Sequence, residues 1–364
     1  MSARTPSVVL VGRGAPERGG IPTYLETVRS SELARRAGVR LLNLARPDVR
    51  QGGRATASNV TRTLGDAARL GRTARRGDVV HLNTALAPGV TLVRTGALVL
   101  AARARGAQVL VHVHGGMVAL WMTTPRRRAL VRACLAGAQR IATVAEGGRA
   151  AMVEACGPDR VLLLDNAVDA EAFRGPAQGG DPPRVLFAGG LTPRKGVLDL
   201  VGASSLLRER GCAHELWLAG GTPDEGSAAE RTVREGAGDQ VRFLGAVEPA
   251  GMPELLRSVD VFCLPSWYEA MPLSVLEAMA TGLPVVATDV GDVARAVLDG
   301  RTGRVVPARD PAALADALEQ LLRDPATRRR YGAAGRAEVE QRFSLPVLED
   351  RLGEVYRDLG ASLA

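Results

Sequence analysis

The chain has 364 residues, 46% of them apolar and 24% charged, which is typical of a folded protein and enough for two α/β domains. Its net charge of +8 is uneven, because residues 1–175 hold 26 arginines and 12 acids whereas residues 176–364 hold 21 basic and 27 acidic residues. The four cysteines are scattered and form no C-x-x-C pair, which predicts free thiols. The apolar runs are too short for a signal peptide or a membrane span, so the expected location is the cytoplasm.

The basic half is typical of a protein that meets an anionic partner, such as a membrane surface, a phosphorylated acceptor or nucleic acid. A general preference of the genome for arginine explains the same count.

Of the 47 basic residues, 46 are arginine and only Lys195 is lysine. Lysine supplies a compact point charge where arginine supplies a planar fork. The single lysine therefore indicates a phosphate pocket.

The chain begins with an apolar strand, Ser7–Gly12, followed by a loop that contains Gly14, Gly19 and Gly20. A helix is expected from Pro22 to about Ala37, because proline favours the first helical turn. A strand, a Gly-rich loop and a helix can place backbone amides against a phosphate. The glycine spacing is not G-x-G-x-x-G, so a plain tight connection is an equal reading.

Another expected strand ends in V-L-V-H-V-H-G-G, at Val109–His114 followed by two glycines. Alternate residues of a strand share a face, so His112 and His114 point the same way. A metal pair lacks a nearby Cys, Asp or Glu to complete it, and a buried core histidine is the ordinary reading for His112. His114 stands at the carboxyl end of its strand, where ligands bind in α/β folds, and is the better functional candidate.

A basic amphipathic helix is expected after Thr124, with Pro125 at its first position and Arg126–Arg128 next. One hypothesis is that this helix rests on an anionic membrane surface near a lipid-linked acceptor. A packed surface helix with a solvated basic edge is the alternative. The Gly- and Pro-rich stretch at residues 174–184 then reads as an interdomain linker.

The second half restarts with a strand at Val185–Ala188 and the turn G-G-L-T-P-R-K-G, in which Arg194 and Lys195 are placed to hold a diphosphate. Further on, the strand Val261–Leu264 leads into a loop with Glu269, and a helix from about Ser274 to Thr281 carries Glu277. A carboxylate in so apolar a helix needs a partner. Two carboxylates around a helix start suit a ligand that has both sugar hydroxyls and phosphate.

This segment, E-A-M-P-L-S-V-L-E-A-M-A-T-G-L-P-V-V-A-T, resembles the Glu-x7-Glu segment of the family-four retaining glycosyltransferases. Other motifs resemble that family in the same order: the G-G-I loop, the H-G strand, the K-G turn, V-x-F-x-G ending at Gly245, and D-G-x-T-G. Two positions depart from it, because Gly190 stands where the family has a phosphate-binding arginine and Arg295 where it has a glutamate. Arg194 is the expected replacement for the missing arginine.

The resemblance implies an α/β protein with the GT-B fold, in which two Rossmann-like doubly wound domains face each other across a cleft. The expected boundaries are an acceptor-binding domain at 1–173, a linker at 174–183 and a nucleotide-sugar-binding domain at 184–343. Residues 344–364 are expected to form a helix that crosses back to the first domain.

The resemblance also implies retaining transfer of a sugar from a nucleotide-diphosphate donor, without a metal or other cofactor. Catalytic roles map onto His114, with His112 as the fallback, and onto Lys195 and Glu269. The donor-binding positions implied are Gly20, Gly190, Arg194, Lys195, Gly245, Glu269, Ala270, Met271, Pro272, Leu273, Ser274 and Glu277.

The partners implied are a nucleotide sugar and a glycan or lipid-linked acceptor, in polysaccharide or cell-envelope assembly. The basic N-terminal domain, and not the resemblance, suggests the anionic inner face of the cell membrane as a further contact. Two alternatives from other classes are a sugar-nucleotide epimerase, which needs no acceptor, and a non-catalytic protein that binds anionic polymers. No nucleic-acid-binding motif is recognisable, so nucleic acid is not an expected partner.

Overall fold

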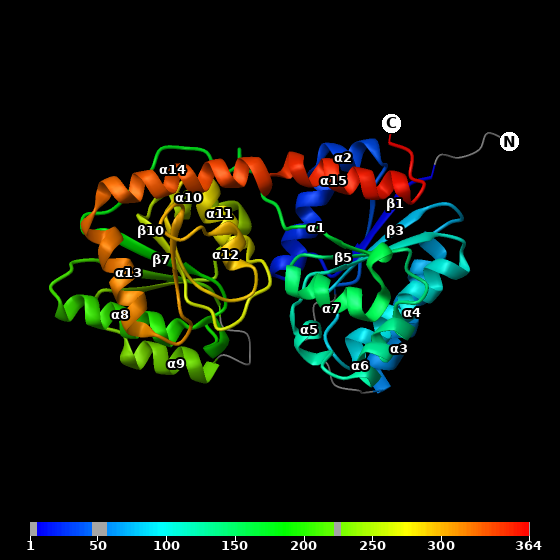
Figure 1. Ribbon diagram of the computed structural model, residues 1–364, viewed down its shortest axis with the longest axis horizontal. Coiled ribbons are helices and arrows are strands. Elements are labelled where there is room, and N and C mark those ends of the chain that lie inside the picture. The colour runs from blue at the N-terminus through cyan, green and yellow to red at the C-terminus, as the bar shows by residue number, and fades with distance from the viewer. Residues whose placement is uncertain (1–5, 46–56, 222–226, 364) are drawn as a thin grey trace. The chain divides into compact units, whose positions relative to one another are not determined.

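The computed structural model describes residues 6–45, 57–221 and 227–363. The chain divides into two compact units, one that runs to Asn166 and includes Leu345–Ala364, and one at Ala167–Ser344 (Figure 1). Residues 167–173, expected at the end of the first domain, and the expected linker 174–183 both group with the second unit. A hydrogen bond from the Val168 N–H to the Phe343 carbonyl, 2.9 Å long, holds the start of this segment there.

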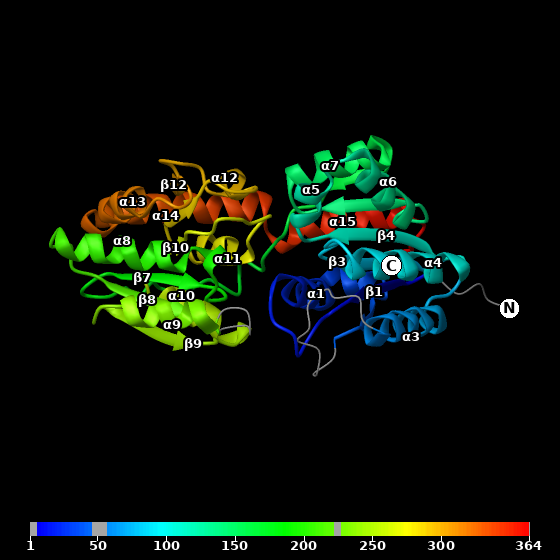
Figure 2. The same cartoon turned by 90° about the horizontal axis from the view of Figure 1, so that it is seen from below.

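The described part of the first unit contains a six-stranded parallel sheet in the order β2-β1-β3-β4-β5-β6. Most of its strand residues are buried and β-branched or leucine, as expected where helices cover both faces of a parallel sheet (Figure 2). The strands are β1 (Val8–Gly12), β2 (Arg40–Asn43), β3 (Val79–Thr84), β4 (Gln108–Val113), β5 (Arg140–Thr143) and β6 (Val161–Leu163).

The helices of this unit are α1 (Gly20–Ser30), α2 (Glu32–Arg36), α3 (Ala57–Thr73), α4 (Val90–Ala104), α5 (Met117–Trp121), α6 (Pro125–Cys134), α7 (Glu146–Cys156) and α15 (Leu345–Asp358). The single helix expected from Pro22 to Ala37 is wrong, because α1 begins at Gly20 and the chain breaks at Ser31. Ser31 is extended, and its side chain accepts a hydrogen bond from the Ala34 N–H, so it caps α2.

The expected return of the C-terminal helix to the first domain is confirmed, since α15 belongs to the first unit. The red α15 lies beside α2 in Figure 1, and the Glu349 carboxylate accepts a hydrogen bond of 3.2 Å from the Leu33 N–H. Farther along α15, the Tyr356 hydroxyl lies 2.8 Å from His81 Nδ1 on β3. The helix is therefore anchored both at α2 and at the middle of the sheet.

The described part of the second unit contains another six-stranded parallel sheet, in the order β12-β11-β10-β7-β8-β9. Its strands are β7 (Arg184–Ala188), β8 (Glu215–Ala219), β9 (Val241–Gly245), β10 (Val261–Leu264), β11 (Val285–Thr288) and β12 (Gly303–Val306). Its helices are α8 (Val197–Glu209), α9 (Ser227–Gly236), α10 (Met252–Arg257), α11 (Leu273–Thr281), α12 (Val293–Ala296), α13 (Pro311–Arg323) and α14 (Pro325–Arg342).

Both sheets have the doubly wound order, in which the chain moves outward to one edge and then returns to build the other. The direction reverses between β1 and β3 in the first unit and between β7 and β10 in the second. Ligands of open α/β sheets bind outside the carboxyl ends of the strands at such a switch point. The fold thus indicates one candidate ligand site in each unit.

In the described residues, every helix is too short or too polar to pass through a bilayer.

Candidate functional site

The two loops at the switch point of the second unit bring Lys195 and Glu269 together. Lys195 ends a short 3-10 turn after β7, and Glu269 lies in the loop after β10. The Lys195 Nζ is 2.5 Å from the Glu269 Oε1, and the Ser266 hydroxyl donates to the same oxygen over 2.7 Å. Only 18% of the lysine side chain and 10% of the glutamate side chain are exposed. The pair is therefore a largely desolvated, hydrogen-bonded ion pair.

Gly196 allows the Lys195 turn to approach this loop. Its φ of 67° is left-handed, and a Cβ there would lie 1.9 Å from the Pro265 carbonyl oxygen. A side chain would therefore be strained in conformation and would also collide with backbone. A hydrogen bond of 2.8 Å from the Trp267 N–H to the Arg194 carbonyl joins the turn and the loop.

The guanidinium group of Arg194 also binds the loop. Its Nη1 donates to the Tyr268 carbonyl over 2.9 Å. The residue before Tyr268 is Trp267, which donates from Nε1 to Asp199 over 2.6 Å, and the Arg309 guanidinium lies 4.4 Å from the centroid of its ring. These contacts give Arg194 a structural task, and its replacement of the family arginine at Gly190 stays a prediction.

Two residues that support Glu269 were not among the predicted site residues. Ser266 holds the Glu269 carboxylate, and its own carbonyl accepts from the Thr288 hydroxyl. Gly291, with a φ of 56°, packs so closely that a Cβ there would lie 2.1 Å from the Glu269 carbonyl oxygen. In the sequence these residues are only a serine and a glycine in loops. Their support of Glu269 becomes visible only when the contacts among the three loops are known.

The loop continues through Ala270 and the buried Met271 to the start of α11. Pro272 is the extended residue before the helix, so Leu273 and Ser274 lie in its first turn, where backbone N–H groups have no partner within the helix. Gly282 ends the helix at a φ of 85°, as predicted. The amides of this first turn can bind an anion.

Glu277 lies one turn further along α11 and is half-buried. In the described part of the chain, its carboxylate has no hydrogen-bond or ion-pair partner, and burial raises its pKa from 4.5 to about 7. A carboxylate in this position can accept two hydrogen bonds from a diol. The partner predicted for Glu277 is therefore absent from the described protein residues, and its role in binding a donor stays a prediction.

The predicted glycines of the second unit lie at the carboxyl edge of its sheet. Gly190 follows β7, and its carbonyl accepts from the Thr192 N–H over 2.9 Å. Gly245 ends β9, and its carbonyl accepts from the Gly220 N–H over 2.7 Å. Both glycines thus stand at the same edge of the sheet as Lys195.

In the first unit, His112 and His114 share a face of β4, with ring centroids 4.2 Å apart. His112 is fully buried beside His81, as the ordinary core reading expects, and burial lowers its pKa to about 3. His114 lies at the strand end, 2.9 Å from the Asn83 Oδ1, and burial beside the other histidines lowers its pKa well below the usual value. It is therefore a neutral imidazole, and its predicted contact with the transferred sugar stays a prediction.

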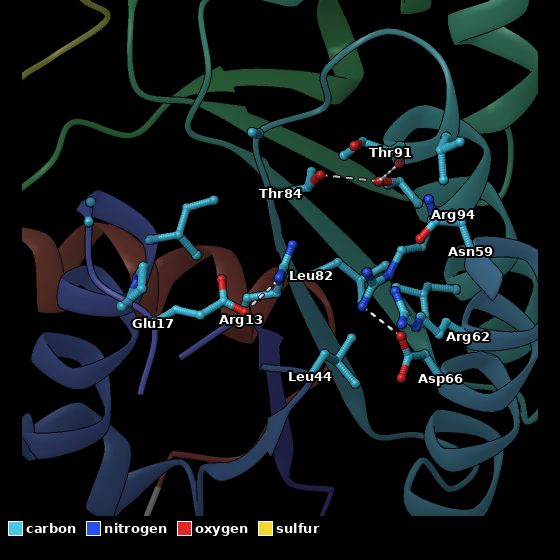
Figure 3. Close-up of a pocket in the computed structure, with 18 of the residues that line it drawn as sticks. Arg13, Glu17, Leu44, Asn59, Arg62, Asp66, Leu82, Thr84, Thr91 and Arg94 are labelled. Carbon is cyan, nitrogen blue, oxygen red and sulfur yellow. Dashed lines mark hydrogen bonds and ion pairs between the residues drawn. The ribbon is translucent and has the colours of Figure 1, made fainter. Parts of the chain in front are cut away.

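Gly20, the predicted donor-binding residue of the N-terminal loop, lines a cavity of about 410 Å³ in the same unit. Figure 3 shows Arg13 and Glu17 on one side of this cavity and Arg62, Arg94 and Asp66 on the other.

The basic helix α6 forms as predicted, with Thr124 as its cap and Pro125 first. Arg128 pairs with Glu154, and Arg132 donates to the Ala155 carbonyl over 2.6 Å, so two of its arginines face α7. Leu130 is 47% exposed. Contact of this helix with a membrane stays a prediction.

Within the described residues, no group of three or more His, Cys, Asp or Glu side chains is arranged to hold a metal ion.

Comparison with known proteins agrees with this geometry. Residues 9–172 match the family described as Glycosyltransferase Family 4, and residues 182–324 match Glycosyl transferases group 1. The chain belongs to the family-four glycosyltransferases, and its two units have the GT-B fold.

One curated relative is the phosphatidyl-myo-inositol mannosyltransferase of Mycobacterium leprae, 37% identical over 228 residues that cover 60% of this chain and 59% of the relative. Another is the alpha-maltose-1-phosphate synthase of Mycobacterium tuberculosis, 34% identical over 229 residues, or 56% of this chain and 58% of the relative. The matches thus span less than two thirds of these relatives.

Among solved structures, sucrose-phosphate synthase from Thermosynechococcus elongatus has a TM-score of 0.80 at 24% identity, over 98% of this chain and 99% of that one. Anabaena HepE in complex with UDP and glucose has a TM-score of 0.77 at 15% identity, over 97% and 100% of the two chains. At these identities the likeness shows the fold.

The role of Gly196 can be tested against Gly211, which has a φ of 68° but nothing within 4 Å of its Cβ position. Gly211→Ala should cost about 1–2 kcal/mol of unfolding free energy, the strain of a left-handed alanine. Gly196→Ala should cost clearly more, because the Pro265 carbonyl must also move. Urea unfolding measures both, and equal losses would show that the close approach is unimportant.

The environment of Glu277 predicts a pH-dependent stability. Its folded-state pKa of about 7 lies above the ordinary 4.5, so the folded state loses stability as the pH rises between these values. Glu277→Gln removes this loss and should raise the unfolding free energy at pH 8 relative to pH 4, on the order of 3 kcal/mol at 1.36 kcal/mol per pKa unit. Urea unfolding at both pH values measures it, with Glu354→Gln on the exposed face of α15 as the control for losing a carboxylate. The same gain at pH 4 and pH 8 would contradict the assignment.

Proposed function

We propose that this chain is a retaining, metal-independent glycosyltransferase that moves a sugar from a nucleotide-diphosphate donor to a glycan or lipid-linked acceptor. The observation that carries the proposal is the desolvated pair of Lys195 and Glu269 at the switch point of the second unit. A cation for phosphate and a carboxylate for sugar hydroxyls meet there, beside the first turn of α11.

The relatives support this substrate class. The Mycobacterium leprae relative is named for mannosyl transfer to a phosphatidylinositol, and the Anabaena structure contains UDP and glucose. Assembly of a cell-envelope glycan or polysaccharide, in the cytoplasm or at the inner membrane face, is the setting we infer. Liposome flotation tests the membrane contact, and Arg126–Arg128 changed to Glu should abolish it if α6 is responsible.

Donor binding exchanges one set of paired charges for another. Without donor, Glu269 neutralises Lys195, which avoids the cost of a buried unpaired charge. A bound diphosphate replaces Glu269 as the partner of the lysine, and the released carboxylate is then available to accept hydrogen bonds from the donor sugar. The first-turn amides of α11 add donors to the diphosphate, and Glu277 accepts from the ribose hydroxyls.

Sugar transfer then needs stabilisation of the leaving diphosphate, which gains negative charge as its bond to the anomeric carbon breaks. Lys195 supplies this stabilisation. The acceptor hydroxyl oxygen bonds to the anomeric carbon on the face that the diphosphate leaves, and the hydroxyl proton passes to the departing phosphate oxygen. Neutral His114 hydrogen-bonds the sugar near the reacting carbon. Proton NMR of the product tests this step, because an inverted anomeric configuration would rule out front-face transfer.

Lys195→Ala should reduce turnover by about two to three orders of magnitude, the scale for loss of one charge-stabilising donor. Arg301→Ala, which removes an exposed cation of the same unit, is the matched control and should retain activity. Because the alanine leaves Glu269 unpaired, the double variant Lys195→Ala/Glu269→Gln separates lost catalysis from lost stability. Turnover near the wild-type value in Lys195→Ala would reject the assignment.

A further inference from the structure

The switch point of the first unit also holds a cavity, and the donor site proposed above does not use it. The cavity measures about 410 Å³, within the range of small-molecule sites. Its walls are the loop after β1, the end of β3 at Thr84 and Ala85, and residues of α3 and α4. It therefore lies at the carboxyl ends of the two strands between which the sheet reverses direction.

The lining is basic. It contains four arginines, Arg13, Arg18, Arg62 and Arg94, and two carboxylates, Glu17 and Asp66. These numbers leave an excess of two positive charges in the wall of one small cavity, where the surrounding protein weakens screening by water.

Both carboxylates are already neutralised by arginines of the lining. Glu17 accepts from Arg13 over 2.7 Å, and the buried Asp66 accepts from Arg94 over 2.6 Å. In the described part of the chain, no carboxylate pairs with Arg62. Figure 3 shows Arg62 and Arg94 side by side on the wall formed by α3 and α4.

Two helix starts add to the positive field. Gly20 and Ile21, in the first turn of α1, and Val90 and Thr91, in the first turn of α4, all line the cavity. The N-terminal ends of helices favour negative charge. The field of the backbone therefore has the same sign as the excess of arginine.

The wall of the cavity is joined through the backbone to the residue that is proposed to contact the transferred sugar. The His114 N–H donates to the Thr84 carbonyl over 2.9 Å, and a Cβ at Gly115 would lie 2.5 Å from the Ala85 carbonyl oxygen. Thr84 and Ala85 form part of the cavity wall. The His114 ring lies on the other face of the sheet, with Asn83, whereas Leu82 and Thr84 line the cavity, so the two share a sheet edge and not a wall.

We propose that this cavity holds a phosphate group of the acceptor, with Arg62 and Arg94 as its main ligands. The inference rests on the proposed function and narrows its acceptor to a phosphate monoester or diester. Such a group belongs either to a soluble sugar phosphate or to a lipid headgroup. The largely exposed Val60 and Leu64 of α3 and Val93 of α4, which neighbour lining residues in sequence, suit the lipid case.

Calorimetric titration with glycerol 3-phosphate tests the site, with glycerol as the neutral control. The titration uses the full chain with Lys195→Ala, so that the proposed donor site does not take up the probe. In this background, Arg62→Gln should weaken binding about tenfold or more, as expected for loss of a charge-assisted hydrogen bond. Arg72→Gln, on α3 but outside the cavity lining, should leave the affinity unchanged.

Vesicles separate the two sources of phosphate. If the acceptor is a lipid, phosphatidylglycerol vesicles should bind the chain in preference to phosphatidylcholine vesicles, and Arg62→Gln should weaken this binding more than Arg72→Gln. If it is a soluble phosphate, only the titration with glycerol 3-phosphate should respond to Arg62→Gln.

Equal effects of Arg62→Gln and Arg72→Gln on the titration would overturn the inference, because they would show a diffuse effect of surface charge. Arg62→Glu provides a graded second variant and should bind more weakly than Arg62→Gln if both retain the wild-type unfolding midpoint. Nucleotide-diphosphate binding with Lys195 intact should survive Arg62→Gln. If the wild-type chain bound no nucleotide diphosphate, the proposed function would be refuted. If it bound nucleotide normally but Arg62→Gln left the affinity for glycerol 3-phosphate unchanged, this inference alone would be refuted.

Discussion

The ion pair between Lys195 and Glu269 is the interaction on which the candidate site of the second unit depends. Removing two charges from water is costly, and either group left alone in this environment would be strongly destabilising. In the proposed donor site, the two members of this pair have different tasks, because the cation binds phosphate and the carboxylate binds hydroxyls. Gly196, Ser266 and Gly291 all serve to bring these two side chains to 2.5 Å.

The two units share one sheet topology but carry different side chains at the switch point. Each sheet is doubly wound, so each has a point where the loops of two adjacent strands diverge and leave space for a ligand. The second unit fills this space with a lysine, carboxylates and the start of α11. The first unit lines it with arginines, and the neutral His114 lies at the same edge of the sheet, on its other face. A donor site and an anionic acceptor site are the consequence that we infer.

Sequence reasoning identified the parallel α/β architecture and the Lys195, Glu269 and Glu277 motifs, because hydrophobic period, turn glycines and spacing are local signals. It missed the break at Ser31, since an extended cap residue inside a helical pattern looks like a helical serine. It also missed Ser266 and Gly291, whose tasks arise only where loops distant in sequence meet. The sequence did not predict the cavity for the same reason, because its arginines come from α3, α4 and the loop after β1, which are distant in sequence.

The measurement that tests the central claim most directly is the thermal stability of the purified chain with UDP, GDP or ADP, each with and without EDTA. The account predicts that one nucleotide stabilises the protein by about 2.7 kcal/mol at a hundred times its Kd, and that EDTA leaves this effect unchanged. That nucleotide would identify the donor base. If none of the three nucleotides stabilised the chain, a donor site at Lys195 and Glu277 would be contradicted. If EDTA abolished the effect, transfer without a metal would be contradicted.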